Sequence, residues 1–162
     1  MNTQIRWFSG TGNTRAIADR LARELALPTE AVQPMLAPSD DAPPVKEADC
    51  LVLAFPVYAF GAPKAVAEFA TTVTLLPGTL VYTVATYAGM AGTPHAEIAG
   101  LIADKEVSHH GGWTIKMPEN YPVMKPPPPA GKQQRLFDAA SERIPGIARV
   151  ISAGEAGPME DS

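Results

Sequence analysis

The apolar positions of the chain fall into short runs that are separated by stretches with helical spacing. The run Cys50–Phe55 contains no polar residue, which is typical of a central parallel strand that is covered on both faces. Elsewhere apolar residues recur every four positions, as at Ile17, Leu21 and Leu25, which indicates a helix with one buried face. The predicted strands are Gln4–Phe8, Ala31–Leu36, Cys50–Phe55, Thr79–Thr86 and Trp113–Met117.

Helical stretches are predicted to begin near Asn13, Pro63, Thr93 and Ala130, so strands and helices alternate along the chain. Alternation of this kind implies a parallel sheet with right-handed crossovers and a helix between successive strands. We therefore expect a three-layer α/β fold with an open, five-stranded parallel sheet. Residues 1–154 are expected to form one domain, and residues 155–162 are expected to form a flexible tail.

The amino-acid composition disfavours several classes of protein. Hydrophobic residues make up 46% of the 162 residues, so a packed core is expected. No segment approaches the roughly 18 uninterrupted apolar residues of a membrane span, and the N-terminus lacks a signal peptide, so we expect a cytoplasmic protein without membrane insertion. A net charge of -4 disfavours a nucleic-acid partner. The single cysteine, Cys50, excludes an internal disulfide and any cysteine-built iron–sulfur or zinc site.

The segment Ser9-Gly-Thr-Gly-Asn-Thr14 lies between the first predicted strand and the first predicted helix. A helix N-terminus at the carboxyl end of a parallel sheet offers unpaired N–H groups and a positive dipole end to an anion. Gly10 and Gly12 allow the backbone to approach a phosphate closely. The hydroxyls of Ser9, Thr11 and Thr14 and the amide of Asn13 can donate further hydrogen bonds. The segment therefore predicts a neutral cradle for one terminal phosphate.

Other phosphate-binding motifs do not match this loop. A P-loop would need a lysine after its last glycine, and a dinucleotide fingerprint would need a third glycine where Arg15 stands. A receiver domain would need paired acidic residues after the first strand, and none is present. The alternative interpretation is a capped turn between strand and helix that binds no ligand.

At these residues the sequence resembles the flavodoxin family, because Phe8–Ala18 is similar to the FMN-phosphate signature of that family. Three further segments carry the resemblance: 55–63, 86–92 and 117–121. The likeness is closest to the flavodoxin-like module of bacterial fusion proteins in which this module precedes a two-cluster ferredoxin module. The cysteine-rich ferredoxin half is absent here, since Cys50 is the only cysteine. The resemblance implies a flavodoxin-like fold, whose parallel sheet has the strand order 2-1-3-4-5, and FMN as the cofactor.

The resemblance also implies that the loops after the third and fourth strands contact the flavin ring. The candidates for stacking on the flavin ring are Tyr58, Phe60 and Tyr87. The alternative is that these side chains only pack over the end of the sheet. In flavodoxins a loop peptide near the flavin reorients on reduction, and Gly61 resembles that position; the alternative is a plain turn before Pro63. The predicted cofactor-binding residues are Ser9, Gly10, Thr11, Gly12, Asn13, Thr14, Pro56, Val57, Tyr58, Phe60, Gly61, Thr86, Tyr87, Ala88, Gly89, Gly92 and Asn120.

The function that these observations favour is an FMN-binding electron-transfer protein that exchanges electrons with a redox partner, either a ferredoxin-like protein or a reductase. One alternative is a small NAD(P)H-dependent FMN reductase that acts on quinone-type acceptors. A second alternative is a flavin-free module with a binding or regulatory role. We predict no catalytic side chains and no metal site, because His109 and His110 are adjacent and His95 stands alone.

Overall fold

Five parallel strands form one sheet in the order β2-β1-β3-β4-β5, as predicted. The computed structural model describes residues 1–118 and 128–161. The strands are β1 Thr3–Trp7, β2 Val32–Pro34, β3 Cys50–Pro56, β4 Leu80–Tyr87 and β5 Ser108–Lys116. The helices of the described residues are α1 Asn13–Glu24, α2 Lys64–Thr72, α3 Pro94–Leu101 and α4 Ala130–Ala153, with 3₁₀ turns at Thr29–Ala31 and Val45–Glu47.

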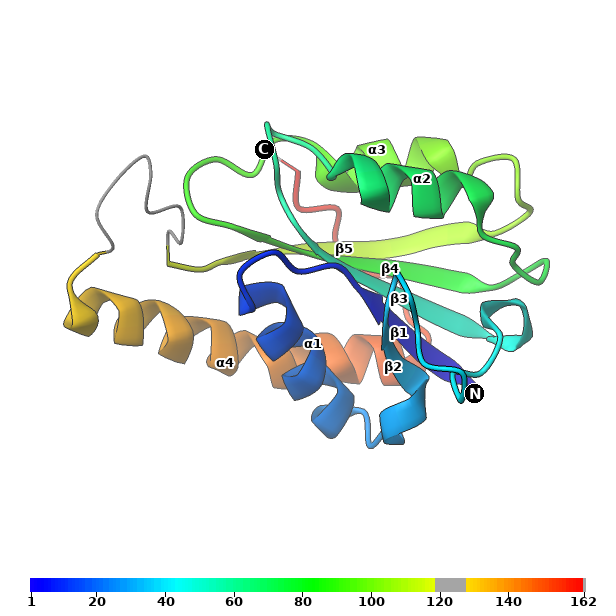
Figure 1. Cartoon of the computed structure of the whole chain (residues 1–162), viewed down its shortest axis with the longest axis horizontal. Coiled ribbons are helices and arrows are strands. Elements are labelled where there is room, and N and C mark those ends of the chain that lie inside the picture. The colour runs from blue at the N-terminus through cyan, green and yellow to red at the C-terminus, as the bar shows by residue number, and fades with distance from the viewer. Residues whose placement is uncertain (119–127, 162) are drawn as a thin grey trace.

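Helices cover both faces of the sheet, which confirms the predicted three-layer fold. Helices α1 and α4 lie on one face, and α2 and α3 lie on the other (Figure 1). Strand β3 contributes to both layers, because Val52 packs toward α1 and α4 while Leu53 packs toward α2 and α3. Side chains on both faces of β3 are therefore buried, which explains why this run shows no polar alternation.

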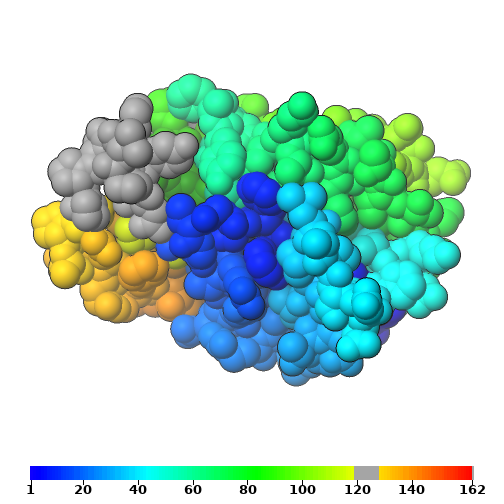
Figure 2. Space-filling model, in the orientation of Figure 1, coloured from blue at the N-terminus to red at the C-terminus, as the bar shows by residue number. Residues whose placement is uncertain are grey.

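The connection between β2 and β3 contains a 3₁₀ turn in place of the helix that strict alternation would need, as its polar, proline-rich residues 37–44 predict. Prolines in this segment lack the N–H groups that a helix needs. Its carbonyl groups instead serve β1: Gln4 donates to the carbonyl of Pro44 at 3.1 Å, and Arg6 donates to the carbonyl of Pro43 at 2.8 Å. The segment, cyan in Figure 2, lies beside the dark blue start of the chain. These contacts place the segment over the side chains of Gln4 and Arg6.

Strand β5 begins at Ser108, earlier than the predicted start at Trp113. The residues before Trp113 are histidines and glycines, which are poor sequence signals for a strand. Their backbones nevertheless pair with β4, with Val81 opposite His109 and Tyr82 opposite Gly111, and the register shifts between these two pairs. Tertiary pairing here overrides local propensity.

The C-terminal segment, for which the sequence predicts a flexible tail, runs along the outer edge of β5. Backbone hydrogen bonds link Gly157 to His110 at 2.7 Å and Gly112 to Pro158 at 2.7 Å. The paired glycines allow this approach, since a Cβ at Gly111 would lie 3.0 Å from the Cα of Gly157. The segment thereby satisfies backbone groups at an edge of the sheet that would otherwise be open.

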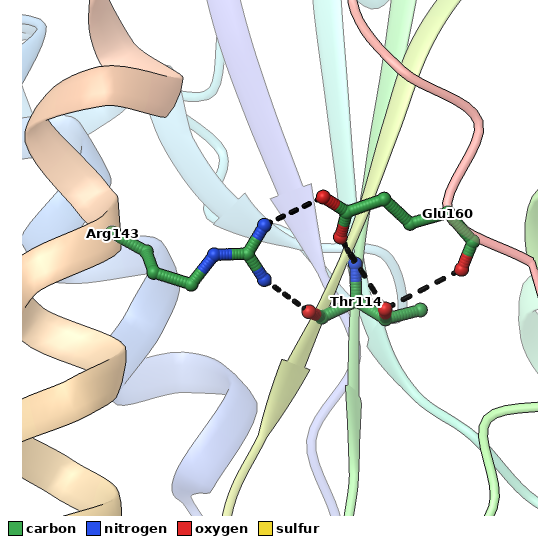
Figure 3. Close-up of polar contacts among 3 residues, drawn as sticks. All are labelled: Thr114, Arg143 and Glu160. Carbon is green, nitrogen blue, oxygen red and sulfur yellow. Dashed lines mark hydrogen bonds and ion pairs between the residues drawn. The ribbon is translucent and has the colours of Figure 1, made fainter.

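Side chains hold the same segment to the rest of the fold. Arg143 of α4 donates to the carbonyl of Thr114 at 2.5 Å and to the carboxylate of Glu160 at 2.6 Å. The Glu160 carboxylate also accepts the backbone N–H of Thr114 at 2.8 Å, as Figure 3 shows.

Within residues 1–118 and 128–161, no helix has the length and apolarity to cross a bilayer.

Candidate functional site

A cleft opens at the carboxyl ends of the strands, where open parallel sheets bind their ligands. Four loops line it, and each follows a strand. The lining residues are Gly10, Thr11, Asn13 and Thr14 after β1; Pro56, Val57 and Tyr58 from the end of β3; Thr86, Tyr87 and Ala88 from the end of β4; and Met117 and Pro118 after β5. None of these residues is ionisable except the two tyrosines, so the cleft offers an anion only neutral donors and backbone.

The loop after β1 turns sharply into α1 at Gly12. This residue is the N-cap of the helix and has a φ of 96°, a conformation that glycine adopts without strain. Its N–H donates to the Ser9 hydroxyl at 3.0 Å, and its carbonyl accepts the N–H of Ala16 at 3.0 Å. The first turn of α1 contains no acidic side chain, so its N–H groups and its dipole stay favourable to an anion.

Two predicted phosphate donors of this loop have partners within the chain. The Thr14 hydroxyl lies 2.8 Å from the Thr86 hydroxyl, and both side chains are buried. The Asn13 amide donates to the carbonyl of Pro118 at 3.3 Å. These contacts join the loop after β1 to the ends of β4 and β5, while Thr11 stays exposed. Thr14 and Asn13 therefore also shape the cleft.

Tyr58 reaches across the cleft onto this loop. A Cβ at Gly10 would lie 2.6 Å from the Tyr58 hydroxyl oxygen, so glycine at this position permits the approach. The Tyr58 ring also meets Phe8 edge to face, with 6.3 Å between ring centroids. In this position Tyr58 closes part of the cleft, whose volume is about 130 Å³.

The residues Tyr58–Gly61 form a tight turn beside the cleft. The N–H of Tyr58 donates to the carbonyl of Gly61 at 2.9 Å, and the N–H of Gly61 donates to the carbonyl of Tyr58 at 3.1 Å. The central residues have positive φ, 49° at Ala59 and 67° at Phe60, and Gly61 is not among the positive-φ residues. Positive φ thus occurs at two residues that carry a Cβ, whereas the sequence suggested that Gly61 would supply this freedom.

The remaining predicted residues lie around the cleft. Phe60 and Gly61 belong to the turn, and Gly89 lies in the loop after β4. Gly92 has a φ of 68° and packs against the carbonyl of Phe60. Asn120 lies outside the described residues. Met117 and Pro118 line the cleft but were not among the predicted residues, although their place directly after the fifth strand is the signal that identifies them.

A buried polar cluster lies away from the cleft. The Thr83 hydroxyl is 2.6 Å from Nδ1 of His95 and 2.8 Å from Nε2 of His109, so His95 is not isolated as the sequence suggested. Burial lowers the pKa of His95, and burial together with the neighbouring His95 lowers the pKa of His109 to about 4. Among the described residues, no three His, Cys, Asp or Glu side chains are grouped to hold a metal ion.

The fold is shared with proteins of known structure, although no protein-family model and no curated protein sequence matches the chain. A flavodoxin of Streptococcus pneumoniae is 15% identical over 95% of this chain and 99% of its own, with a TM-score of 0.65. The two-electron reduced flavodoxin of Megasphaera elsdenii is 21% identical over 86% and 98%, with a TM-score of 0.59.

A flavodoxin described as a WrbA-like protein, from Agrobacterium tumefaciens, is also similar. It is 16% identical over 93% of this chain and 98% of its own, with a TM-score of 0.56. The structural neighbours are thus flavodoxins and flavodoxin-like proteins. At these identities the similarity concerns the fold, and the chain has the flavodoxin-like α/β fold.

Proposed function

We propose that this chain binds FMN in the cleft and acts as an electron-transfer protein. The observation that carries the proposal is the N-terminus of α1, which has no side-chain cap and adjoins a cleft with no ionisable side chain apart from tyrosine. Such a terminus suits a doubly charged phosphate ester. The resemblance of residues 8–18 to the FMN-phosphate signature and the flavodoxin-like fold support the same cofactor.

The residues present fit FMN in two parts. The phosphate would lie against Ser9–Thr14, and the ring would lie between the loops after β3 and β4, near Tyr58 and Tyr87. A bound flavin supplies the electron-transfer chemistry, so the chain has to bind it, orient it and limit its contact with water. No charged group is needed at the phosphate, because the helix dipole and neutral donors can bind it.

The cleft is small for a site that binds a flavin. Its volume of about 130 Å³ is below the roughly 300–1,000 Å³ that is usual for ligand pockets. Tyr58 takes up part of the space because its hydroxyl rests against Gly10. We therefore propose that Tyr58 moves away from the loop after β1 when FMN enters, so that its ring lies beside the flavin.

The exchange partner is proposed to be a separate redox protein. Intramolecular transfer to iron–sulfur clusters is excluded for these residues, since Cys50 is buried and is the only cysteine. The resemblance to the flavodoxin-like half of flavodoxin–ferredoxin fusions favours a ferredoxin-like protein or a reductase as that partner.

A second candidate is an NAD(P)H-dependent FMN reductase. It is favoured by the similarity to the WrbA-like flavodoxin of Agrobacterium tumefaciens. The two candidates differ in steady-state kinetics, because only the reductase oxidises NAD(P)H with a quinone acceptor. An electron carrier would show no turnover unless a partner protein is added.

The test is a titration of the purified apoprotein with FMN and with riboflavin, together with mass spectrometry of any cofactor released on denaturation. We expect FMN as the released species and tighter binding of FMN than of riboflavin. Recovery of FAD, or the same affinity for both ligands, would contradict a phosphate site at Ser9–Thr14.

A substitution in the loop after β1 tests the phosphate site directly. Thr11→Ala removes an exposed hydroxyl from the loop after β1, and a hydrogen bond to a charged group contributes about 1.5–3 kcal/mol. The dissociation constant of FMN should therefore rise at least about tenfold, while that of riboflavin should stay unchanged. Thr72→Ala is the matched control, because the Thr72 hydroxyl is exposed and donates to the carbonyl of Glu68 within α2.

A further inference from the structure

The turn Tyr58–Gly61 is held against α3 by two hydrogen bonds. The backbone N–H of Thr93, the N-cap of α3, donates to the carbonyl of Phe60 at 3.1 Å. The carboxylate of Glu97, in the first turn of α3, accepts the backbone N–H of Ala62 at 2.8 Å. One bond lies within the turn and the other lies directly after it, so α3 fixes the path of the chain at both points.

The turn needs such support because of its backbone conformation. Ala59 and Phe60 have φ values of 49° and 67°, which are disfavoured for any residue that carries a Cβ. Conformations of this kind persist only where the surrounding structure holds them. The hydrogen bonds from Thr93 and Glu97 are contacts outside the turn that do so.

The carboxylate of Glu97 lies in the space beside Gly61 that a side chain at position 61 would occupy. A Cβ at Gly61 would lie 2.6 Å from Oε2 of Glu97, and its three nearest atoms would all belong to the Glu97 carboxylate. Gly61 does not have a positive φ, so its backbone would accept alanine. The glycine is therefore explained by the close approach of the carboxylate, rather than by the conformation of the main chain.

Helix α3 is itself held in place by contacts with the C-terminal segment and with the sheet. The carboxylate of Asp161 accepts the backbone N–H groups of His95 and Ala96 at 3.0 and 2.9 Å, so the C-terminal segment caps the first turn of the helix. Figure 1 shows the C-terminal end of the chain beside α3. The His95 ring is fully buried against Thr83 of β4. The helix that carries Glu97 is thus fastened to both the sheet and the C-terminal segment.

The geometry points to Glu97 as a positioning residue that holds the turn Tyr58–Gly61 in the shape of the cleft wall. This inference rests on the proposed function for the identity of the ligand, FMN. When the Glu97 carboxylate is removed, the turn relaxes away from positive φ, and the backbone that carries Tyr58 is no longer held at the position from which its ring can lie beside the flavin. Flavin then binds more weakly, although Glu97 is exposed and lies outside the cleft lining.

The first test needs no flavin. Hydrogen exchange of the Ala62 amide in the apoprotein should accelerate about tenfold in Glu97→Ala, because the N–H loses its acceptor. Glu97→Gln keeps an acceptor oxygen at the same length and should stay close to the unmodified chain. Glu68→Ala is the control, since Glu68 lies on the exposed surface of α2 beside Lys64.

A double-mutant cycle tests the fit of Gly61 to Glu97. Gly61→Ala should displace the carboxylate and accelerate Ala62 exchange to the same extent as Glu97→Ala. The double variant should exchange no faster than Glu97→Ala alone, because both changes break the same bond. Additive effects of the two substitutions would overturn the inference.

The second test measures ligand binding. The dissociation constants of FMN and riboflavin should both rise about tenfold in Glu97→Ala, because the turn is proposed to lie beside the ring system, which the two ligands share. Glu97→Gln should restore most of the affinity. A Glu97→Ala variant with fast Ala62 exchange but unchanged flavin affinity would overturn the positioning role. If the unmodified chain binds no flavin, the proposed function fails, and Ala62 exchange still decides whether Glu97 holds the turn.

Discussion

The hydroxyl of Thr14 lies 2.8 Å from the hydroxyl of Thr86, and this contact joins the start of α1 to the end of β4. Both side chains are buried, at 1% and 4% exposure, so water does not replace either partner. The loop proposed to hold a phosphate is therefore attached to the strand whose following loop is proposed to contact the flavin ring.

The Thr14–Thr86 contact predicts coupled stability effects. Thr14→Val or Thr86→Val should each lower the free energy of unfolding by about 1–3 kcal/mol, because the remaining hydroxyl stays buried without its partner. The double variant should lose clearly less than the sum of the two single losses. Urea denaturation of all four proteins measures this, and strict additivity would show that the two hydroxyls act independently.

A main-chain contact at Gly92 predicts a large cost for adding a single methyl group. Gly92 has a φ of 68°, and a Cβ there would clash with the backbone of Phe60. Gly92→Ala should lower the free energy of unfolding by at least about 2 kcal/mol, since left-handed φ alone costs alanine roughly 1–2 kcal/mol. Gly89→Ala is the control, because a Cβ at Gly89 would meet no atom within 4 Å. Equal thermal stability of the two variants would contradict the close contact.

Two arginine–glutamate pairs connect α4 to the C-terminal segment and should differ in strength. Arg143 and Glu160 are partly buried and share Thr114 of β5 (Figure 3), whereas Arg149 and Glu155 are mostly exposed. Glu160→Ala should lower the free energy of unfolding by about 1–3 kcal/mol, because the Thr114 N–H loses its acceptor. Glu155→Ala should change it by less than about 1 kcal/mol. Similar losses, measured by urea denaturation, would contradict this difference.

The buried histidine cluster predicts a pH dependence of stability. Burial lowers the pKa of His109 from 6.5 to about 4; the neighbouring charges of His95 and His110 add to this effect, and Asp161 opposes it. Between pH 6.5 and 4 the unfolded chain therefore binds more protons than the folded one. The contribution of His109 is fully present above pH 6.5 and is lost as the pH falls toward 4.

Urea denaturation at pH 7, 6 and 5 measures this contribution. His109→Gln should flatten the fall in unfolding free energy over this range, because it removes one group that takes up a proton only on unfolding. The remaining slope should come in part from His95, whose pKa burial also lowers. The same slope in the variant and in the unmodified chain would contradict the prediction for His109.

The local pattern of apolar residues, glycines and hydroxyls was sufficient to predict the central strand and the loop before α1. The unbroken apolar run at Cys50–Phe55 identified the central strand, because a strand buried on both faces has no polar positions. Glycines and hydroxyls at Ser9–Thr14 identified the loop before α1, since the requirements of a helix N-terminus are local. The alternation of elements predicted a parallel sheet, whereas the strand order came from the resemblance to flavodoxins.

Tertiary structure alone decided which polar groups meet. The glycine-rich start of β5 pairs because β4 lies beside it, and the segment after Gly154 lies along β5 because its backbone groups pair with the edge of that strand. Glu97 is an ordinary exposed helix residue in the sequence, yet its carboxylate reaches the amide of Ala62. Hydrophobic periodicity reports which face of an element is buried. It carries no information on the distant donor or acceptor that completes a hydrogen bond, because that partner is brought near only when the layers of the fold pack together.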